Sequence, residues 1–212
     1  MRQLHSTERA AETAGDDLAK VVVRRQMIQA GNTLLLALEP LSDEEFFAGG
    51  LNGISPAWTV GHLACVTDLF ASWMTGQTEL PRPMHDVFNS LDIGRKSGTK
   101  ADAVDRAVYP KAELLLLFRQ SQVRALQLLD VFDVGLWDVA TPRQVPETLP
   151  TWGAIWQALG VHCSWHLGEL SGAIERFHGT YTLNSVVHYF YTRRESGLQT
   201  AVVPIVPARS GG

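Results

Sequence analysis

Residues 151–179 read TWGAIWQALGVHCSWHLGELSGAIERFHG, and their apolar side chains recur at steps of three and four residues. This period is typical of an amphipathic helix. Thr151 offers a side-chain oxygen that can cap the first amides, and Gly179 suits the left-handed conformation in which many helices end. We therefore expect a helix from Trp152 to Phe177. Its inward-facing positions are, in order, Trp152, Ile155, Leu159, His162, His166, Leu170 or Ala173, and Phe177. Two histidines thus stand where a buried helix face usually carries apolar residues.

Three earlier stretches of the chain show the same helical period. The first covers residues 16–39. The second is expected at about residues 56–75, because Ser55 can cap it and Pro56 suits the first helical turn. The third is expected over residues 110–131, again with a proline at its start. Four such helices predict an all-α fold.

The connections and the two ends complete the expected organisation of the chain. The segment from Gly76 to Val108 has no sustained period and is unusually long, so we expect a loop that either crosses the bundle or forms a lid. Its length allows the second and third helices to be parallel. Residues 1–15 are expected to be an N-terminal extension, and residues 16–178 the bundle. Residues 179–212 are expected to hold one short helix, at 181–194, and a flexible arm.

Composition excludes several classes of protein. The chain has 212 residues, 45% of them hydrophobic, which suits one domain with a sizeable core. Its 18 basic residues against 22 acidic ones give a formal charge of −4, so we expect no nucleic-acid partner. No run of apolar residues is long enough for a membrane span or a secretory signal. With only two cysteines, a cytoplasmic protein is expected.

The histidines are the candidate site. His162 and His166 are four residues apart, so on a helix both imidazoles lie on the same side and can approach one ion. His62 is the other histidine expected to point inward from a helix. Each histidine alone is more simply explained as a hydrogen-bonded core residue. Three on two core faces favour one shared metal ion, because buried imidazoles need partners. Cys163 follows His162 where the HExxH motif of zinc proteases has Glu, so peptidase chemistry of that type is not expected.

Two motifs resemble one known family. SPAWTVGHL at residues 55–63 and the pattern His162-xxx-His166-xx-Glu169 are similar to the DinB-like superfamily of metal-dependent enzymes, and the resemblance covers roughly residues 16–178. It implies a four-helix bundle with a long crossover after the second helix, and a single metal ion bound by His62, His162 and His166. It also implies frequent dimerisation, so we expect a homodimer. Similar proteins include transferases and isomerases that use the thiols bacillithiol or mycothiol.

An open metal site suggests catalysis. Three protein ligands leave a position for water or substrate, so the expected function is a metal-dependent enzyme that activates a thiol or a water, either a thiol S-transferase or a hydrolase. We expect a divalent ion, first zinc or nickel and otherwise iron or manganese, with a small-molecule substrate and a low-molecular-weight thiol as cosubstrate. The alternative is a non-enzymatic bundle that binds a small ligand or a protein partner.

Two further residues near the histidines have open roles. Glu169 is the candidate catalytic residue, as a general base, although a metal ligand, an acceptor for a ligand's ring N–H, or a solvated carboxylate also fit its position. Many similar proteins carry Gln at this place. Cys65 is either a thiolate ligand or, as the simpler reading, a small core residue. Four tryptophans are expected near the helix starts and the site, in ordinary packing or around a substrate: Trp58, Trp152, Trp156 and Trp165.

Overall fold

The protein is all-α, as the sequence predicts. The computed structural model describes residues 2–49, 54–88, 104–142 and 145–178, with side chains for residues 18–49, 54–88, 104–142 and 145–170. These ranges contain no strand, only one isolated β-bridge between Ala140 and Thr151. The elements are α1 (Arg2–Leu38), α2 (Asp43–Phe47), α3 (Pro56–Thr75), α4 (Arg82–Phe88), α5 (Lys111–Val131), the 3₁₀ turn η1 (Val134–Leu136) and α6 (Trp152–His178).

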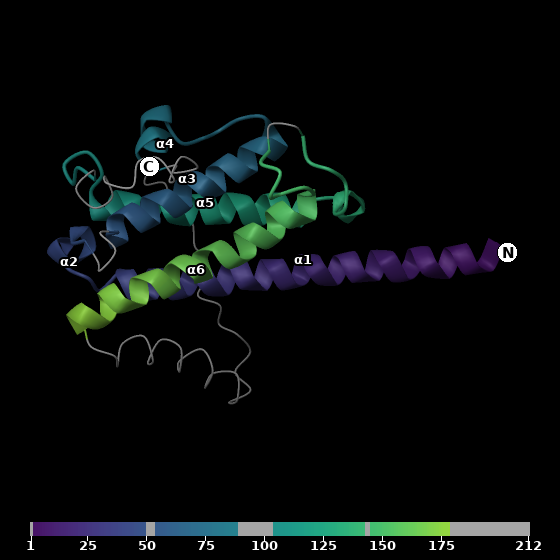
Figure 1. The fold of residues 1–212 in the computed structure, drawn as a ribbon, viewed down its shortest axis with the longest axis horizontal. Coiled ribbons are helices and arrows are strands. Elements are labelled where there is room, and N and C mark those ends of the chain that lie inside the picture. The colour runs from purple at the N-terminus through teal and green to yellow at the C-terminus, as the bar shows by residue number, and fades with distance from the viewer. Residues whose placement is uncertain (1, 50–53, 89–103, 143–144, 179–212) are drawn as a thin grey trace, which may run out of the picture.

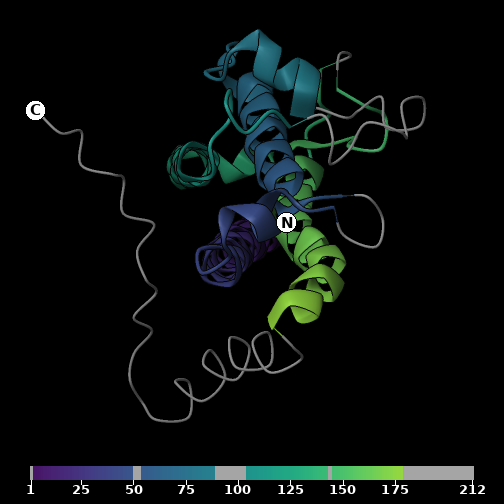
Figure 2. The same ribbon diagram turned by 90° about the vertical axis from the view of Figure 1, so that its left-hand side faces the viewer.

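Four long helices make up most of the structure. Helix α1 packs against α6 and α5, and α3 packs against α5 and α6, so the contacts close a ring of four. Figure 2 shows the four helices placed around a common centre. In Figure 1, α1 and α6 run in one direction while α3 and α5 run in the other. The second and third of the predicted helices are therefore parallel, as expected for a long crossover. The exact arrangement as a four-helix bundle stays a prediction.

Local sequence signals define the starts of three helices. Ser55 caps α3, and its Oγ accepts a hydrogen bond from the backbone N–H of Trp58 at 3.1 Å. Thr151 caps α6 in the same way, accepting from the N–H of Ala154 at 3.2 Å. Pro110 precedes the first residue of α5. At its other end α3 stops at Gly76, which has the positive φ of 78° that glycine tolerates best. These three predicted helices are confirmed.

Helix α1 begins earlier than the sequence analysis expects. It starts at Arg2 instead of Asp16, so the predicted N-terminal extension continues the helix. The expected boundary rests on where the apolar period starts. Residues 2–14, however, contain no Pro or Gly and include several good helix formers, and one Gly at position 15 costs too little to end a helix. Figure 1 shows the N-terminal part of α1 projecting beyond the other long helices.

Two short helices lie in segments that were expected to be connections. Helix α2 follows Ser42, whose side chain and that of Glu45 form a capping box. Helix α4 lies inside the predicted crossover loop of residues 76–108 and packs against α3, with Met84 and Phe88 buried. The prediction of a loop over the whole of this segment is wrong at residues 82–88, because two apolar side chains are enough to dock a short helix on the core. The loop's residues 89–103 lie outside the described residues.

The C-terminal predictions cannot be compared with the structure. Both the short helix expected at residues 181–194 and the flexible arm lie outside the described residues. The same holds for Gly179, the expected end of α6. Among the helices that are described, none combines the length and apolarity that a bilayer span requires.

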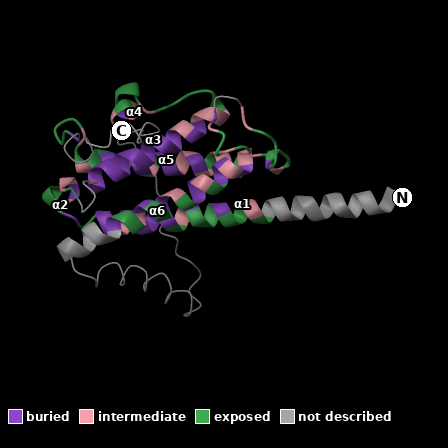
Figure 3. Ribbon diagram, in the orientation of Figure 1, coloured by how far each residue is buried: buried purple, intermediate pink, exposed green. Residues whose placement is uncertain are grey.

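Helix α3 lies deepest in the protein. Fifteen of its 20 residues are buried, and they include small residues such as Gly61, Ala64 and Cys65 as well as large ones. Figure 3 shows many buried positions along α3 and α5, and others in the C-terminal half of α1 and in parts of α6. Because this helix is buried on most sides, each polar group on it needs a hydrogen-bond partner inside the protein.

Candidate metal centre

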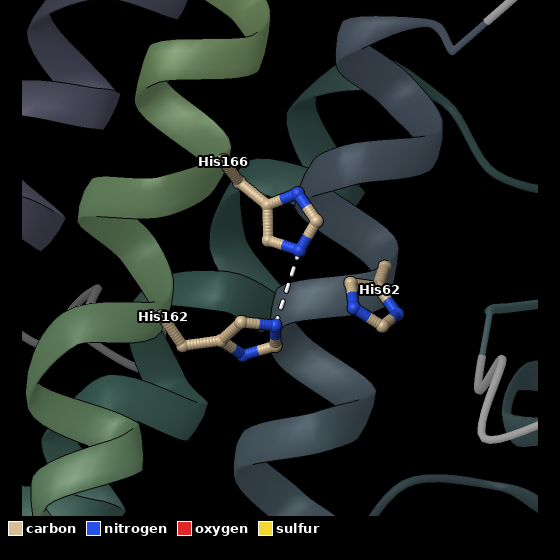
Figure 4. Close-up of side chains that lie close together, drawn as sticks. All are labelled: His62, His162 and His166. Carbon is tan, nitrogen blue, oxygen red and sulfur yellow. Dashed lines mark hydrogen bonds between the residues drawn. The ribbon is translucent and has the colours of Figure 1, made fainter.

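Three histidines converge between α3 and α6. His62 comes from α3, and His162 and His166 come from successive turns of α6; Figure 4 shows the three rings around one space. One ring nitrogen from each lies within 4.8 Å of the others. The ring centroid of His62 is 5.2 Å from that of His162 and 4.9 Å from that of His166. The structure thus brings together the three residues that the sequence singles out.

The helices position these rings through packing on each side. Helical residues four apart share a face, so His162 and His166 point the same way and their ring centroids are 4.7 Å apart. On α3, the ring of Trp58 stacks on that of His62 at 4.8 Å with an interplanar angle of 8°. Trp58 precedes His62 by four residues, and side chains on a helix lean toward its N-terminus. The indole therefore supports one face of the His62 ring.

Hydrogen bonds at Nδ1, the ring nitrogen that points away from the other histidines, fix the tautomers of His62 and His166. His62 Nδ1 lies 2.9 Å from the backbone carbonyl oxygen of Phe88, at the end of α4. His166 Nδ1 lies 2.7 Å from a carboxylate oxygen of Glu169. Both oxygens only accept, so in each neutral ring Nδ1 carries the proton and Nε2 carries the lone pair. This is the usual arrangement of metal-binding histidines, in which the second nitrogen donates to a carbonyl or carboxylate.

The rings of His162 and His166 face each other directly. Nε2 of His162 and Nε2 of His166 are 3.1 Å apart. Because His166 Nε2 has the lone pair, His162 Nε2 donates the proton of that hydrogen bond. Such a proton sits where a cation that binds both nitrogens would replace it, so the metal-free protein already holds the two donor atoms at a short distance.

Burial keeps all three imidazoles neutral. Loss of hydration lowers the pKa of His62 to about 4 and the pKa of His162 to about 3. Loss of hydration also lowers the pKa of His166, although the carboxylate of Glu169 acts in the opposite direction. Metal ions bind neutral imidazole, so at pH 7 no imidazolium has to lose its extra proton before an ion binds. Three convergent neutral nitrogen donors fit a divalent transition metal and do not suit calcium or magnesium, which prefer oxygen.

The structure places Glu169 behind the site. Its two oxygens bind His166 Nδ1 and, at 3.1 Å, the indole Nε1 of Trp165. Since Nδ1 of His166 is on the opposite side of the ring from the nitrogen that faces His162, the carboxylate contacts the outer edge of the histidine cluster. The predicted role as a general base has no direct support from this position. The role of acceptor for a ligand's ring N–H, which the sequence left open, describes the observed contact.

Neither cysteine joins the histidines. Cys65 is completely buried, and burial together with the charge of Asp68 raises the pKa of its thiol to about 12. Cys163 is also buried, which raises its pKa to about 12. The group of converging donor atoms contains neither sulfur, and in the metal-free protein both thiols stay protonated at neutral pH, so the two cysteines act as small core residues.

Two supporting groups of the site are not assigned by the sequence analysis. Trp58 could have been paired with His62 from their spacing of four residues on one helix. The carbonyl of Phe88 could not, because a backbone acceptor has no sequence signature and α4 itself was not expected. Two other tryptophans differ in their exposure: Trp156 is fully buried in the core, while Trp165 has 69% of its surface exposed.

Comparison with known proteins adds the family. Residues 26–170 match the model of the DinB superfamily. Neither the curated proteins nor the solved structures gave a match to this chain. The matched range covers more than half of the sequence and runs from the middle of α1 to the residue after Glu169, so it includes all three histidines. The chain is a member of the DinB superfamily.

Proposed function

We propose that this protein is a metal-dependent enzyme whose single divalent ion is held by His62, His162 and His166. The observation that carries this proposal is the convergence of three neutral imidazoles, from two different helices, within 4.8 Å. Hydrogen bonds orient these rings: Nδ1 of His62 has the Phe88 carbonyl as its acceptor, and Nδ1 of His166 has the Glu169 carboxylate. The Nε2 atoms of His162 and His166 lie 3.1 Å apart and face each other.

The charge of the donor set suggests the class of reaction. Three neutral ligands do not reduce the charge of a divalent ion, so an anion is favoured at the remaining position. When bound, the ion would lower the pKa of a water or a thiol and so supply a nucleophile near neutral pH. We propose a small-molecule substrate and a reaction of the S-transferase or hydrolase type, with a low-molecular-weight thiol as the cosubstrate of the former. Zinc or nickel suits three imidazoles best, followed by iron or manganese.

The chain's own residues prepare the site for this chemistry. Burial holds the three rings neutral, and the Phe88 carbonyl and Glu169 carboxylate hold two of them in the tautomer that directs Nε2 inward. The stacked indole of Trp58 excludes water from one face of His62. Rings that are oriented before the ion arrives lose less entropy on binding it. A homodimer stays a prediction.

Metal content is the decisive measurement. Protein purified without a nickel column should contain about one divalent ion per chain, and His162→Gln should contain much less. The matched control is His85→Gln, because His85 is also largely buried and hydrogen-bonded, but to Asp68 and away from the three histidines. A parent protein without stoichiometric metal, also after incubation with zinc or nickel, would contradict the proposal.

Activity then separates an enzyme from a binding protein. In a screen of electrophilic and hydrolysable small molecules, with and without added thiols, turnover should disappear on chelation and on His62→Gln substitution. It should return when metal is added back to the parent protein. If metal is present but no turnover depends on it, the alternative of a non-enzymatic helical protein that binds a ligand or partner is the better account.

A further inference from the structure

A chain of hydrogen bonds runs along the outside of α6 to one of the candidate ligands. Trp165 donates its indole N–H to one oxygen of Glu169 at 3.1 Å, and His166 donates its Nδ1–H to the other at 2.7 Å. Trp165 and Glu169 are four residues apart, and His166 and Glu169 three apart, so all three lie on adjacent positions of the same helix surface. Each carboxylate oxygen thus has its own donor.

This arrangement restricts a side chain that would otherwise move. The Glu169 side chain is 32% exposed, and a glutamate at such a surface usually samples several rotamers in water. Two donors on its two oxygens define the plane of the carboxylate and aim one oxygen at His166. The indole of Trp165 is stiff, and 69% of the residue's surface is exposed. Trp165 is therefore not a core residue, and the observed contact of its indole N–H is the hydrogen bond to Glu169.

The two hydrogen-bonded ligands differ in their acceptors. His62 donates to the neutral backbone carbonyl of Phe88, and any residue type at position 88 has such a carbonyl. His166 donates to a charged carboxylate, which makes a stronger hydrogen bond and renders the opposite nitrogen more electron-rich. Of these two rings, only that of His166 depends on side chains at the protein surface.

We propose that Trp165 and Glu169 are positioning residues for His166: Glu169 fixes the tautomer and the ring orientation, and Trp165 fixes Glu169. This replaces the expectation that Glu169 is a general base. The part that concerns metal affinity rests on the proposed function. The part that concerns the tautomer does not, because it can be read in the metal-free protein.

The tautomer of His166 is the first test. In metal-free protein, nitrogen NMR of the histidine rings should find His166 with its proton on Nδ1. Glu169→Gln keeps an acceptor oxygen and should preserve this tautomer, whereas Glu169→Ala should give a mixture with the Nε2–H form. Since both side chains are at the surface, the variants should fold, which circular dichroism checks. If the proton of His166 is on Nε2 in the parent, or if Glu169→Ala leaves the tautomer unchanged, the proposal is wrong.

Metal affinity is the second test, measured by competition with a chelator and by the visible spectrum of the cobalt-loaded protein. Glu169→Ala should weaken binding on the order of 10–100-fold, the usual effect of removing such an acceptor. Trp165→Phe should weaken it less, and should add no further loss in the Glu169→Ala background, because the indole acts through the carboxylate. Glu113→Ala, at an exposed carboxylate in the first turn of α5, is the control and should have no effect.

The two proposals fail in different ways. A parent protein that binds no metal, yet has the predicted His166 tautomer and its dependence on Glu169, overturns the metal proposal and leaves the positioning role in place. A parent that binds metal with an affinity unchanged by Glu169→Ala overturns the positioning role and leaves the metal proposal in place.

Discussion

Two buried threonines of α3 differ in their hydrogen bonding. Thr67 Oγ1 accepts a hydrogen bond from the side-chain amide of Gln122, on α5, at 3.2 Å. Thr59 is fully buried, and its hydroxyl has no partner among the residues that the structure describes. Other helical threonines, such as Thr33, donate to the carbonyl four residues earlier. An unpartnered buried hydroxyl costs about 1–3 kcal/mol, so Thr59 lowers the stability of the protein as it stands.

Substitution of each threonine by valine tests this difference. Thr59→Val should raise the free energy of unfolding by about 1 kcal/mol, because a methyl group replaces a hydroxyl that makes no bond. Thr67→Val is the matched control on the same helix and should lower it by about 1–3 kcal/mol, because the Gln122 amide loses its acceptor. Urea unfolding of the metal-free proteins measures both. A loss of stability in Thr59→Val as large as that in Thr67→Val would show that the Thr59 hydroxyl has a partner after all.

At the scale of single residues, sequence spacing predicts which side chains meet but not what each one does. His162 and His166 follow from their separation of four, and His62 from its place on a second core face. The role of Glu169 does not follow, since a residue three positions beyond a histidine can turn its carboxylate toward an ion, a ring nitrogen or water. Rotamer choice decides among these, and here the indole of Trp165 influences it.

At the scale of elements, strong local signals give good helix boundaries. Helices α3, α5 and α6 begin where a cap or a proline stands before an apolar period, and all three are predicted correctly. Helices α2 and α4 are too short for a period to be visible, although the capping box of Ser42 and Glu45 was a usable signal for α2. The helix α4 matters for the site, because its last residue supplies the carbonyl that binds His62.

Gly61 allows α4 to approach α3. A Cβ atom at Gly61 would lie 2.4 Å from the ring of Phe88, so Gly61→Ala forces α4 away. We expect this variant to lose about 1–3 kcal/mol of stability through overpacking. We also expect weaker metal binding, because the displaced Phe88 carbonyl no longer fixes the tautomer of His62. Thermal unfolding and metal competition provide the two measurements.

The control for this prediction is Gly168→Ala on α6. A Cβ atom there meets nothing within 4 Å, and alanine is the better helix former, so stability should rise by about 0.5–1 kcal/mol. If Gly61→Ala were as harmless as Gly168→Ala, the close packing of α4 on α3 would not be needed for the fold.

At the scale of the whole molecule, α3 connects two polar sites within an apolar interior. Through His62 it faces the two histidines of α6. Through Asp68, less than two turns further on, it is joined to α4 and α5. Sequence analysis finds the first of these sites, because its residue types and spacing are characteristic of metal binding. It does not find the second, because Asp, Arg and His are common on helices and only the fold shows that these three meet.

Asp68 is a buried carboxylate with several partners. It accepts hydrogen bonds from His85 Nε2 and from the backbone N–H of Glu79, both at 3.0 Å, and it pairs with the guanidinium of Arg124. Burial alone would raise its pKa, but the hydrogen bonds from His85, Glu79 and Leu80 and the charge of Arg124 outweigh burial and lower it from 3.8. The folded protein therefore favours the ionised form.

This lowered pKa makes part of the stability dependent on pH. As the pH falls, the unfolded chain takes up the proton of Asp68 before the folded protein does. The contribution of Asp68 is thus complete above about pH 4, and it is lost as the pH falls through the lower pKa of the folded state.

Asp68→Asn should lower the free energy of unfolding by about 3 kcal/mol at pH 7, because it removes the buried carboxylate that pairs with Arg124 and leaves that guanidinium only its exposed charge partner, Glu79. The difference between the parent and this variant should then shrink when urea unfolding is repeated at pH 3. Asp130→Asn breaks an exposed ion pair with Arg24 and should change stability by less than about 1 kcal/mol at either pH. An effect of Asp68→Asn that is equally large at pH 7 and pH 3 would mean that the ionised carboxylate does not hold α3, α4 and α5 together.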